Sequence, residues 1–446
     1  GETSRNDLAF RYNALAGAKG LGVFSHDQAN QYFAAALALY EADPECASNE
    51  EFVAFIADYS LCLNISLDVN TMMEIAPRVR VILSSMGDSP DHVLFLHHYV
   101  SGLTTNTRFR EALEIQSELT AMAERIGDAK SLAYAMVNEI SVAIYAAPIP
   151  NSEFEAKKAE IEAALATFDD AYLQNFYLAT VGWNEITRGR VIGAREIAER
   201  IIADGERTND PRSLGYGTAM KSLVSVVTDD HETALALSEE AARLSRAEFE
   251  LAIAESTRIG ALVALEKPGA LEAAQAYVDM SREKGSKLFG GVPQTMLGVA
   301  HAMEGRIGEG LRRIEETIAQ RESEGTLVAA DWSRLFLCEV YLQILSGEGG
   351  ASIGVLLRNF GALAGVMLNG EKRIRALLEK VRENKQFDTD GHYNARGEMI
   401  LGLLCKAKKR KKEAVEHLTR ARELIAPTGN SPMLTRIEDA LKDLAA

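Results

Sequence analysis

The chain has 446 residues and a net charge of −16, with 47% hydrophobic and 25% charged residues. This composition is ordinary for a folded protein and excludes disorder over most of the length. The acidic balance repels phosphate backbones, which disfavours direct binding to nucleic acid.

The sequence also indicates the compartment. The N-terminal segment is polar, and no apolar run reaches about 18 residues, so we expect neither a signal peptide nor a membrane-spanning helix. Cys46, Cys62, Cys338 and Cys405 lie far apart and form no paired motif. This spacing favours buried free thiols in a reducing compartment, and we expect a cytoplasmic protein.

In chain order, the sequence reads as helices of about 12–20 residues joined by short polar turns. One spacing recurs: a small residue, a small residue twelve positions later, an apolar or small residue four further on, and another small or apolar residue after three more. The five instances are Gly17–Ala29–Phe33–Ala36, Gly182–Ala194–Ala198–Ile201, Ser222–Ala234–Ser238–Ala241, Gly298–Gly310–Ile314–Thr317 and Gly402–Ala414–Leu418–Ala421. Small residues allow two antiparallel helices to cross closely, and this spacing is typical of tetratricopeptide repeats with a period of about 34 residues.

Less regular repeats lie between these instances. We expect two helices in each of the ranges 51–85, 92–125, 129–168 and 248–282. Each range has the helical periodicity without the full spacing of small residues.

The pattern breaks at Gly347–Gly350, which we interpret as a loop between repeats. Beyond it we expect two helices, near Val355–Met367 and Glu371–Glu383, and then an irregular stretch, Asn384–Tyr393, where the superhelix is distorted. The predicted fold is therefore an all-α right-handed superhelix, an α-solenoid of about twelve tetratricopeptide-like hairpins. Regular repeats occupy 1–346, and irregular helices with a C-terminal repeat continue the solenoid over 347–446.

Motifs for catalysis or metal binding do not appear in the sequence. There is no phosphate-binding loop, no HExxH and no nucleophile elbow. Asp388-Thr389-Asp390-Gly391 begins like a calcium loop, but Met399 stands where the ligand Glu belongs, so we expect a helix-capping turn with Asp390 or Asn394 as the cap. We predict no catalytic, cofactor-binding or metal-binding residues.

Two groups of residues are candidates for binding. Phe176, Trp183 and Ile186 share one side of a first helix and are predicted to line the groove of the superhelix, the alternative being packing against a neighbouring helix. The basic run contains Lys408, Lys409, Arg410 and Lys411, with Lys406 and Lys412 at its ends. It would contact an anionic partner, the alternative being a solvated turn.

The last sixty-odd residues carry a family resemblance. Gly391-His392 is followed by Ala395-Arg396-Gly397-Glu398-Met399-Ile400-Leu401-Gly402, and later by Glu416-His417-Leu418-Thr419 and Ser431-Pro432-Met433-Leu434. This resembles the C-terminal tetratricopeptide region of bacterial class III adenylate/guanylate cyclases, in which a cyclase domain and an AAA-type ATPase module come first. The stretch from Phe289 to Leu345 is similar to the same region.

The resemblance implies a regulatory sensor region of a signalling cyclase and transfers no catalytic residue. The partner is then a protein or peptide, or the upstream domains of the same polypeptide, and paired cyclase domains imply a homodimer of the parent. A first residue other than Met agrees with a fragment. Two alternatives remain open: a stand-alone scaffold or adaptor, and the sensor region of an ATPase-type transcription activator.

Overall fold

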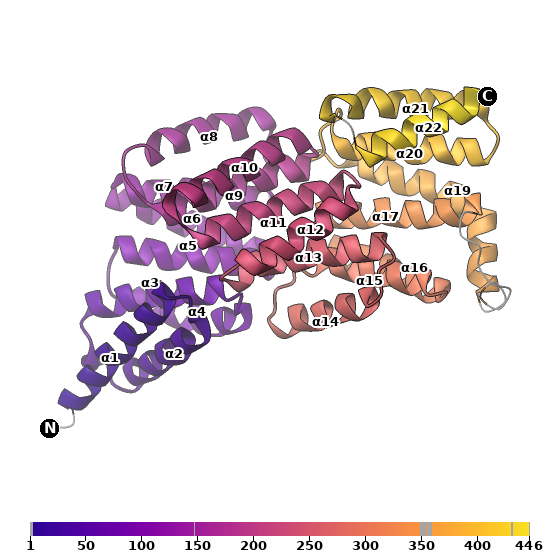
Figure 1. Ribbon diagram of the computed structural model, residues 1–446. Coiled ribbons are helices and arrows are strands. Elements are labelled where there is room, and N and C mark those ends of the chain that lie inside the picture. The colour runs from indigo at the N-terminus through magenta and orange to yellow at the C-terminus, as the bar shows by residue number, and fades with distance from the viewer. Residues whose placement is uncertain (1–2, 147, 348–354, 356–358, 430, 446) are drawn as a thin grey trace. The chain divides into compact units, whose positions relative to one another are not determined.

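The computed structural model describes residues 3–146, 148–347, 355, 359–429 and 431–445. Over these residues it contains 21 α-helices and no strand, which confirms the all-α solenoid class (Figure 1). The α-helices are α1 (Thr3–Gly22), α2 (His26–Ala42), α3 (Asn49–Ile65), α4 (Val69–Leu83), α5 (Pro90–Thr105), α6 (Phe109–Ile126), α7 (Ala129–Ala143), α8 (Asn151–Leu165), α9 (Ala171–Arg188), α10 (Val191–Thr208), α11 (Pro211–Val227), α12 (His231–Leu244), α13 (Glu248–Ala264), α14 (Ala270–Glu283), α15 (Gly291–Met303), α16 (Ile307–Ser323), α17 (Leu327–Ser346), α19 (Phe360–Glu383), α20 (His392–Ala407), α21 (Lys411–Ile425) and α22 (Pro432–Ala445). None of the described helices has the length and apolarity needed to cross a membrane.

The chain divides into two compact units, each built from antiparallel helix pairs. Unit 1 comprises Gly1–Thr180, Ser245–Leu251 and Ser281–Leu288, and unit 2 comprises Val181–Leu244, Ala252–Met280 and Phe289–Ala446. Within each unit, consecutive helices pack on one another, as in α1 with α2 or α10 with α11. The predicted boundary near residue 346 stays a prediction.

The first helix of most hairpins ends in the same turn. One residue adopts a positive φ, and the amide of the next residue donates to a carbonyl five positions back, as from Ser25 to Gly20 (2.8 Å) and from Arg410 to Cys405 (2.9 Å). These are Schellman turns, which use otherwise unpaired carbonyl groups to end a helix. We call the positive-φ residue the turn residue; it is Phe24, Leu67, Thr107, Gly189, Asp229, Glu266, Gly305 or Lys409.

The recurring spacing of small residues holds the two helices of a hairpin together. A Cβ atom placed on Gly17 would lie 2.6 Å from the ring of Phe33, and one on Gly402 would lie 2.6 Å from Cγ of Leu418. Ala29 and Ala414, twelve residues after the glycines, are fully buried. The predicted close crossing is therefore confirmed, because any side chain at these glycines would overlap the facing helix.

The four less regular ranges each contain the two helices expected of them. The predicted pair of helices near Val355–Met367 and Glu371–Glu383 is wrong, because α19 runs without interruption from Phe360 to Glu383. Gly370 does not break α19; a Cβ there would lie 3.1 Å from Leu345 of α17, so the glycine permits close packing. Of the predicted loop Gly347–Gly350, all but Gly347 lies outside the described residues.

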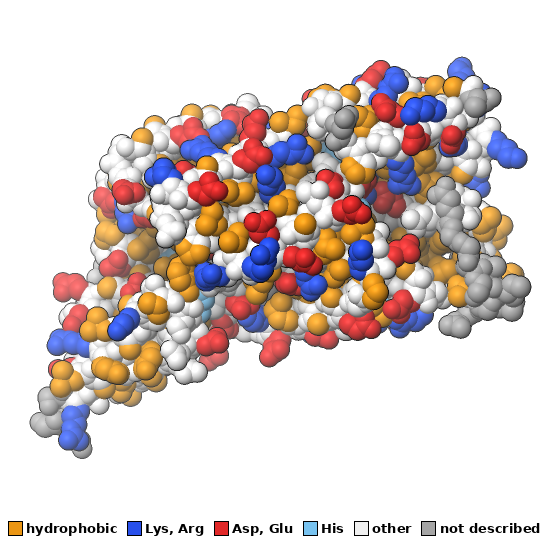
Figure 2. All heavy atoms as spheres, viewed as in Figure 1, with side chains coloured by type: hydrophobic (Ala, Val, Ile, Leu, Met, Phe, Trp, Pro, Cys, Tyr) orange, Lys and Arg blue, Asp and Glu red, His pale blue; other side chains and the backbone are white. Residues whose placement is uncertain are grey.

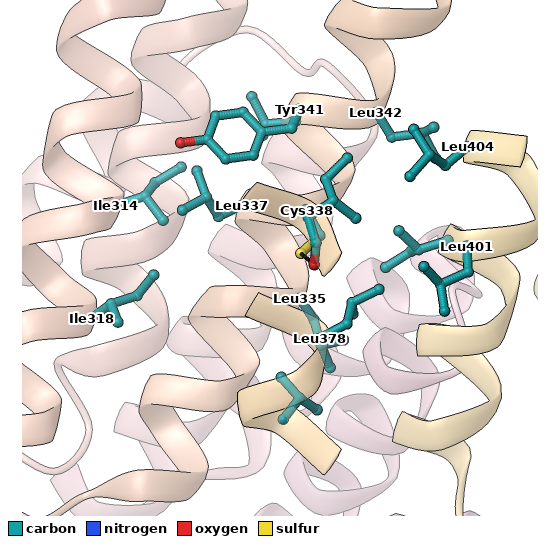
Figure 3. Packing of buried hydrophobic residues seen from close by; sticks show 14 of the residues in the cluster. Ile314, Ile318, Leu335, Leu337, Cys338, Tyr341, Leu342, Leu378, Leu401 and Leu404 are labelled. Atoms are coloured by element: carbon teal, nitrogen blue, oxygen red, sulfur yellow. Dashed lines mark hydrogen bonds between the residues drawn. The ribbon is translucent and has the colours of Figure 1, made fainter. Parts of the chain in front are cut away.

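The C-terminal part of unit 2 has a continuous apolar core (Figure 3). Ile314 and Ile318 of α16 face Leu337 and Tyr341 of α17, while Leu378 of α19 packs between α17 and α20. The same apolar core also includes Leu401 and Leu404 of α20. This core fixes α20, and with it the polar residues near its N-terminus.

Candidate functional site

The three predicted groove residues all lie on α9 but in different surroundings. Phe176 is half-buried, and its ring centroid lies 4.9 Å from that of His97 in an edge contact. Trp183 is half-buried, whereas Ile186 is 2% exposed and packs inside unit 2. Their role in ligand binding stays a prediction.

Phe176 belongs to an aromatic cluster centred on His97 of α5. The imidazole of His97 lies edge-on to the rings of Tyr134 (5.0 Å) and His98 (5.1 Å). Its side chain is fully buried, and in this part of the structure neither ring nitrogen has a hydrogen-bond partner. Burial lowers the pKa of His97 to about 3, so the ring is neutral near pH 7.

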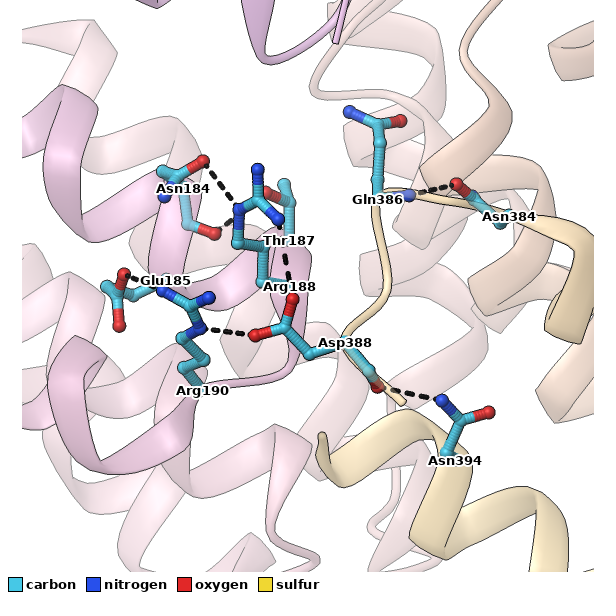
Figure 4. A network of polar contacts seen from close by, with 9 residues as sticks. All are labelled: Asn184, Glu185, Thr187, Arg188, Arg190, Asn384, Gln386, Asp388 and Asn394. Atoms are coloured by element: carbon cyan, nitrogen blue, oxygen red, sulfur yellow. Dashed lines mark hydrogen bonds and ion pairs between the residues drawn. The ribbon is translucent and has the colours of Figure 1, made fainter. Parts of the chain in front are cut away.

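Unit 2 contains a polar site between helices that are far apart in the sequence (Figure 4). Residues 384–391, here called the brace loop, precede α20 and contact the turn between α9 and α10. The carboxylate of Asp388 forms ion pairs with Arg190 and with Arg188 (3.3 Å). At the other end of the loop, the Nδ2 atom of Asn384 donates to Asp331 of α17 (2.6 Å).

Backbone contacts join the same two segments. The amide of Asp388 donates to the carbonyl of Arg188 (3.1 Å), and the amide of His392 donates to that of Gly189 (2.9 Å). Gly391 makes this approach feasible, since a Cβ on it would lie 2.7 Å from the carbonyl oxygen of Arg188. The predicted cap of α20 is wrong, because Gly391 is the N-cap without a side-chain bond and Asn394 donates to the carbonyl of Asp388 (2.7 Å).

One turn into α20, Arg396 forms a buried charge cluster. Its guanidinium lies 2.9 Å from Asp229, in the turn before α12, and 2.9 Å from Glu339 of α17. All three side chains are at most 18% exposed. One arginine therefore joins three hairpins of unit 2, and two carboxylates compensate its charge.

This cluster sets the ionisation of its neighbours. Burial alone would raise the pKa of Asp229, but the charge of Arg396, its hydrogen bond and the nearby His231 and His392 together outweigh burial, and the pKa lies below its usual value. Burial and the charge of Arg396 lower the pKa of His392 to about 4. The imidazole of His392 beside this cluster is therefore neutral near pH 7.

The basic run occupies the turn between α20 and α21. Lys408, Lys409 and Lys411 are exposed, whereas the guanidinium of Arg410 lies 2.6 Å from Glu371 of α19. Arg410 therefore has a structural partner inside the chain, while the three lysines face solvent. Contact of the run with an anionic partner stays a prediction.

Groups that commonly carry catalysis or bind metals were also located in the structure. The four cysteines are buried, and burial raises the pKa of Cys62 to about 12. No group of three His, Cys, Asp or Glu side chains with metal-binding geometry occurs among the described residues. Sequence reasoning missed the roles of Asp388 and Arg396, although the Asp388–Gly391 motif and the charged turn Arg188–Arg190 were visible signals.

No family model and no curated relative matches this sequence. Among solved structures, the chain is similar to a Rap protein complexed with competence and sporulation factor (12% identity, 80% of this chain, 98% of that chain, TM-score 0.48). It is also similar to the apo quorum sensor NprR from B. thuringiensis (13%, 72%, 100%, 0.34) and to the APC/C hetero-tetramer Cut9–Hcn1 (12%, 98%, 94%, 0.27). None of these likenesses bears on what the chain binds.

Proposed function

We propose that this chain is a non-catalytic interaction and regulatory region that recognises a protein or peptide through its first helices. The observation that carries the proposal is the uneven placement of buried polar side chains. First helices bury many of them, including His97, His98, Asn138, Ser222, Thr295, Asp331, Arg334 and Arg396. The second helices α4, α10 and α21 bury only apolar residues and glycine.

Burying polar groups is costly unless they are paired. Second helices also bury polar side chains, namely Gln116, Ser238, Ser281, Thr317 and Arg321, but most lie on first helices. This bias fits a face selected for specific recognition, where polar contacts orient a partner. The half-buried aromatic side chains Phe176 and Trp183 lie on such a helix. Aromatic anchors beside polar groups are typical of protein interfaces.

The proposal places this region in a multidomain adenylate/guanylate cyclase. The resemblance of the stretch after Gly391 to the tetratricopeptide part of such cyclases supports this placement. The partner would be a protein or peptide, or the upstream domains of the same polypeptide, and the parent would act as a homodimer. Binding on the first helices would be relayed by a small shift between repeats.

The test is selection of peptides from a random phage-displayed library on the immobilised chain, followed by affinity measurement in solution. Trp183→Ala should weaken the selected peptides about tenfold, as expected for an aromatic anchor. Ile192→Ala, at an exposed residue of the second helix α10, is the matched control and should leave affinity unchanged. Selected peptides that bind Trp183→Ala and Phe176→Ala as tightly as the wild type would contradict the proposal.

The cyclase context has a separate test. The reading frame upstream of Glu2 should encode a cyclase domain and a nucleotide-binding module. A stop codon and a start codon immediately upstream would remove the cyclase context and leave a free-standing scaffold.

A further inference from the structure

Helix α1 has an exposed apolar stripe with basic ends. Arg5, Leu8, Tyr12, Leu15 and Lys19 follow one another at spacings of three and four residues, which places them along one face of a helix. Leu8 is 64%, Tyr12 67% and Leu15 71% exposed. Hydrophobic side chains are visible over the α1–α2 end of the chain in the space-filling view (Figure 2).

In the other first helices that end with a positive-φ residue, the residue equivalent to Tyr12 is buried. Tyr12 lies twelve residues before Phe24, the turn residue of its hairpin. The equivalent residues lie twelve positions before each of the other turn residues and before Gly347, the positive-φ C-cap of α17. All of them are buried: Phe55, Phe95, Tyr177, Gly217, Ala254, Pro293, Leu335 and Gly397. Tyr12 therefore occupies an interface position of the repeat and lacks the cover that its equivalents have.

The second helix of the preceding hairpin supplies that cover. Phe55 packs on Phe33 of α2, with ring centroids 6.0 Å apart. A Cβ on Gly217 would lie 2.7 Å from Ile202 of α10, and one on Gly397 would lie 3.7 Å from Leu378 of α19. The packing of the repeats thus identifies what belongs on α1, namely a helix with the pattern of a second helix.

Helix α22 differs from α1 in the character of its exposed side. α22 buries Met433, Ile437 and Ala440 against the preceding hairpin, and its outward side carries exposed charged residues, among them Glu438 and Lys442. The exposed side of α22 is therefore polar, whereas the exposed stripe of α1 is apolar.

The charges on α1 indicate the chemistry of the occupant. Arg5 and Lys19 are exposed at the two ends of the stripe, about 21 Å apart along the axis. Antiparallel pairing with α1 of a second copy would bring Arg5 of one helix beside Lys19 of the other, which is repulsive. We propose that this face docks an amphipathic α-helix of a partner polypeptide, antiparallel to α1, with an apolar stripe and a carboxylate near each end.

This surface shares no residue with Phe176 and Trp183 of α9, so its test stands alone. The probe is a fluorescein-labelled synthetic peptide with the sequence of α2, His26–Ala42, because α2 covers the equivalent position in the next hairpin. It carries Asp27 and Glu41 near its ends. The full chain should bind it saturably in fluorescence anisotropy, and a peptide with Asp27→Lys and Glu41→Lys should bind about fivefold more weakly at low salt.

Tyr12→Glu and Leu15→Glu in the full chain should each weaken binding by about tenfold or more. Val81→Glu is the matched control, since Val81 is 73% exposed on α4 and should leave binding unchanged. Circular dichroism checks that each variant stays folded. Absence of saturation up to about 1 mM peptide, unchanged binding by both α1 variants, or a wild-type dimer in light scattering that Tyr12→Glu dissociates would overturn the proposal.

Discussion

The hydroxyl of Tyr393 donates a hydrogen bond to the carbonyl oxygen of Ile186, 2.8 Å away in space and 207 residues away in sequence. In a simple solenoid each repeat contacts only its neighbours. Unit 2 departs from that pattern, because the start of α20 is fixed to the end of α9 by side-chain and backbone bonds.

Removal of the Asp388 carboxylate should weaken this connection. Asp388→Ala leaves Arg188 and Arg190 without a shared anion, and we expect a loss of about 2 kcal/mol in the free energy of unfolding by urea. The matched control is Asp390→Ala, at an exposed carboxylate in the same loop, which should change stability by less than about 0.5 kcal/mol. Equal effects of the two substitutions would argue against a stabilising contact between the brace loop and the turn after α9.

Substitution of Arg396 should destabilise the chain more than substitution of Asp388. Arg396→Met leaves Asp229 and Glu339 as uncompensated buried charges, so unfolding should become easier by about 3–5 kcal/mol. Adding Asp229→Asn to this variant should recover part of the loss, because it removes one of those charges. Arg420→Met, at an exposed arginine of α21, serves as control. A wild-type urea midpoint for Arg396→Met would contradict the buried cluster.

The burial of His97 predicts a dependence of stability on pH. Its pKa is about 3 in the folded chain and about 6.5 in the unfolded chain, so protons favour the unfolded state. The stability that the neutral His97 contributes is fully present above pH 6.5 and is lost as pH falls from 6.5 towards 3. Between pH 6.5 and pH 5 the loss from this group is about 2 kcal/mol.

The variant His97→Phe isolates this contribution, since phenylalanine keeps an aromatic ring within the cluster. Urea unfolding at pH 7, 6 and 5 should show that the wild type loses more stability than the variant as pH falls. Parallel curves for the two proteins would mean that His97 has the same pKa in the folded and unfolded chains, which would contradict its burial as a neutral ring.

The helix crossings can be tested with glycine substitutions of opposite expected sign. Gly402→Ala places a methyl group against Leu418 and should destabilise the chain by about 2 kcal/mol. Gly365→Ala in α19 meets no atom within 4 Å and should stabilise it by about 0.5–1 kcal/mol through helix propensity. Thermal unfolding of the two variants should shift in opposite directions, and a stabilising Gly402→Ala would refute the close crossing.

Local features of the sequence predict most of the fold. The crossing of Gly402 with Leu418 is set by residues sixteen positions apart, and helical periodicity makes such pairs visible. The break expected between Met367 and Glu371 is absent, and Gly370 within that interval packs against Leu345 of α17. Tertiary packing overrides propensity at such a position.

The polar site of unit 2 was not predictable in the same way. The pairing of Asp388 with Arg188 depends on how successive hairpins stack, and no periodicity encodes it. Either charge alone resembles the many solvated charges of this acidic chain. Only their shared burial distinguishes them, and burial is a property of the folded unit.

The bond between Tyr393 and Ile186 also has a consequence for synthesis. A ribosome that has just added Ile186 must add 207 more residues before Tyr393 exists. At about 5–20 residues per second, this interval lasts roughly 10–40 s. During that time the early hairpins of unit 2 can form, but the end of α9 lacks its final partner, so the unit can reach its complete native state only after Tyr393 has been added.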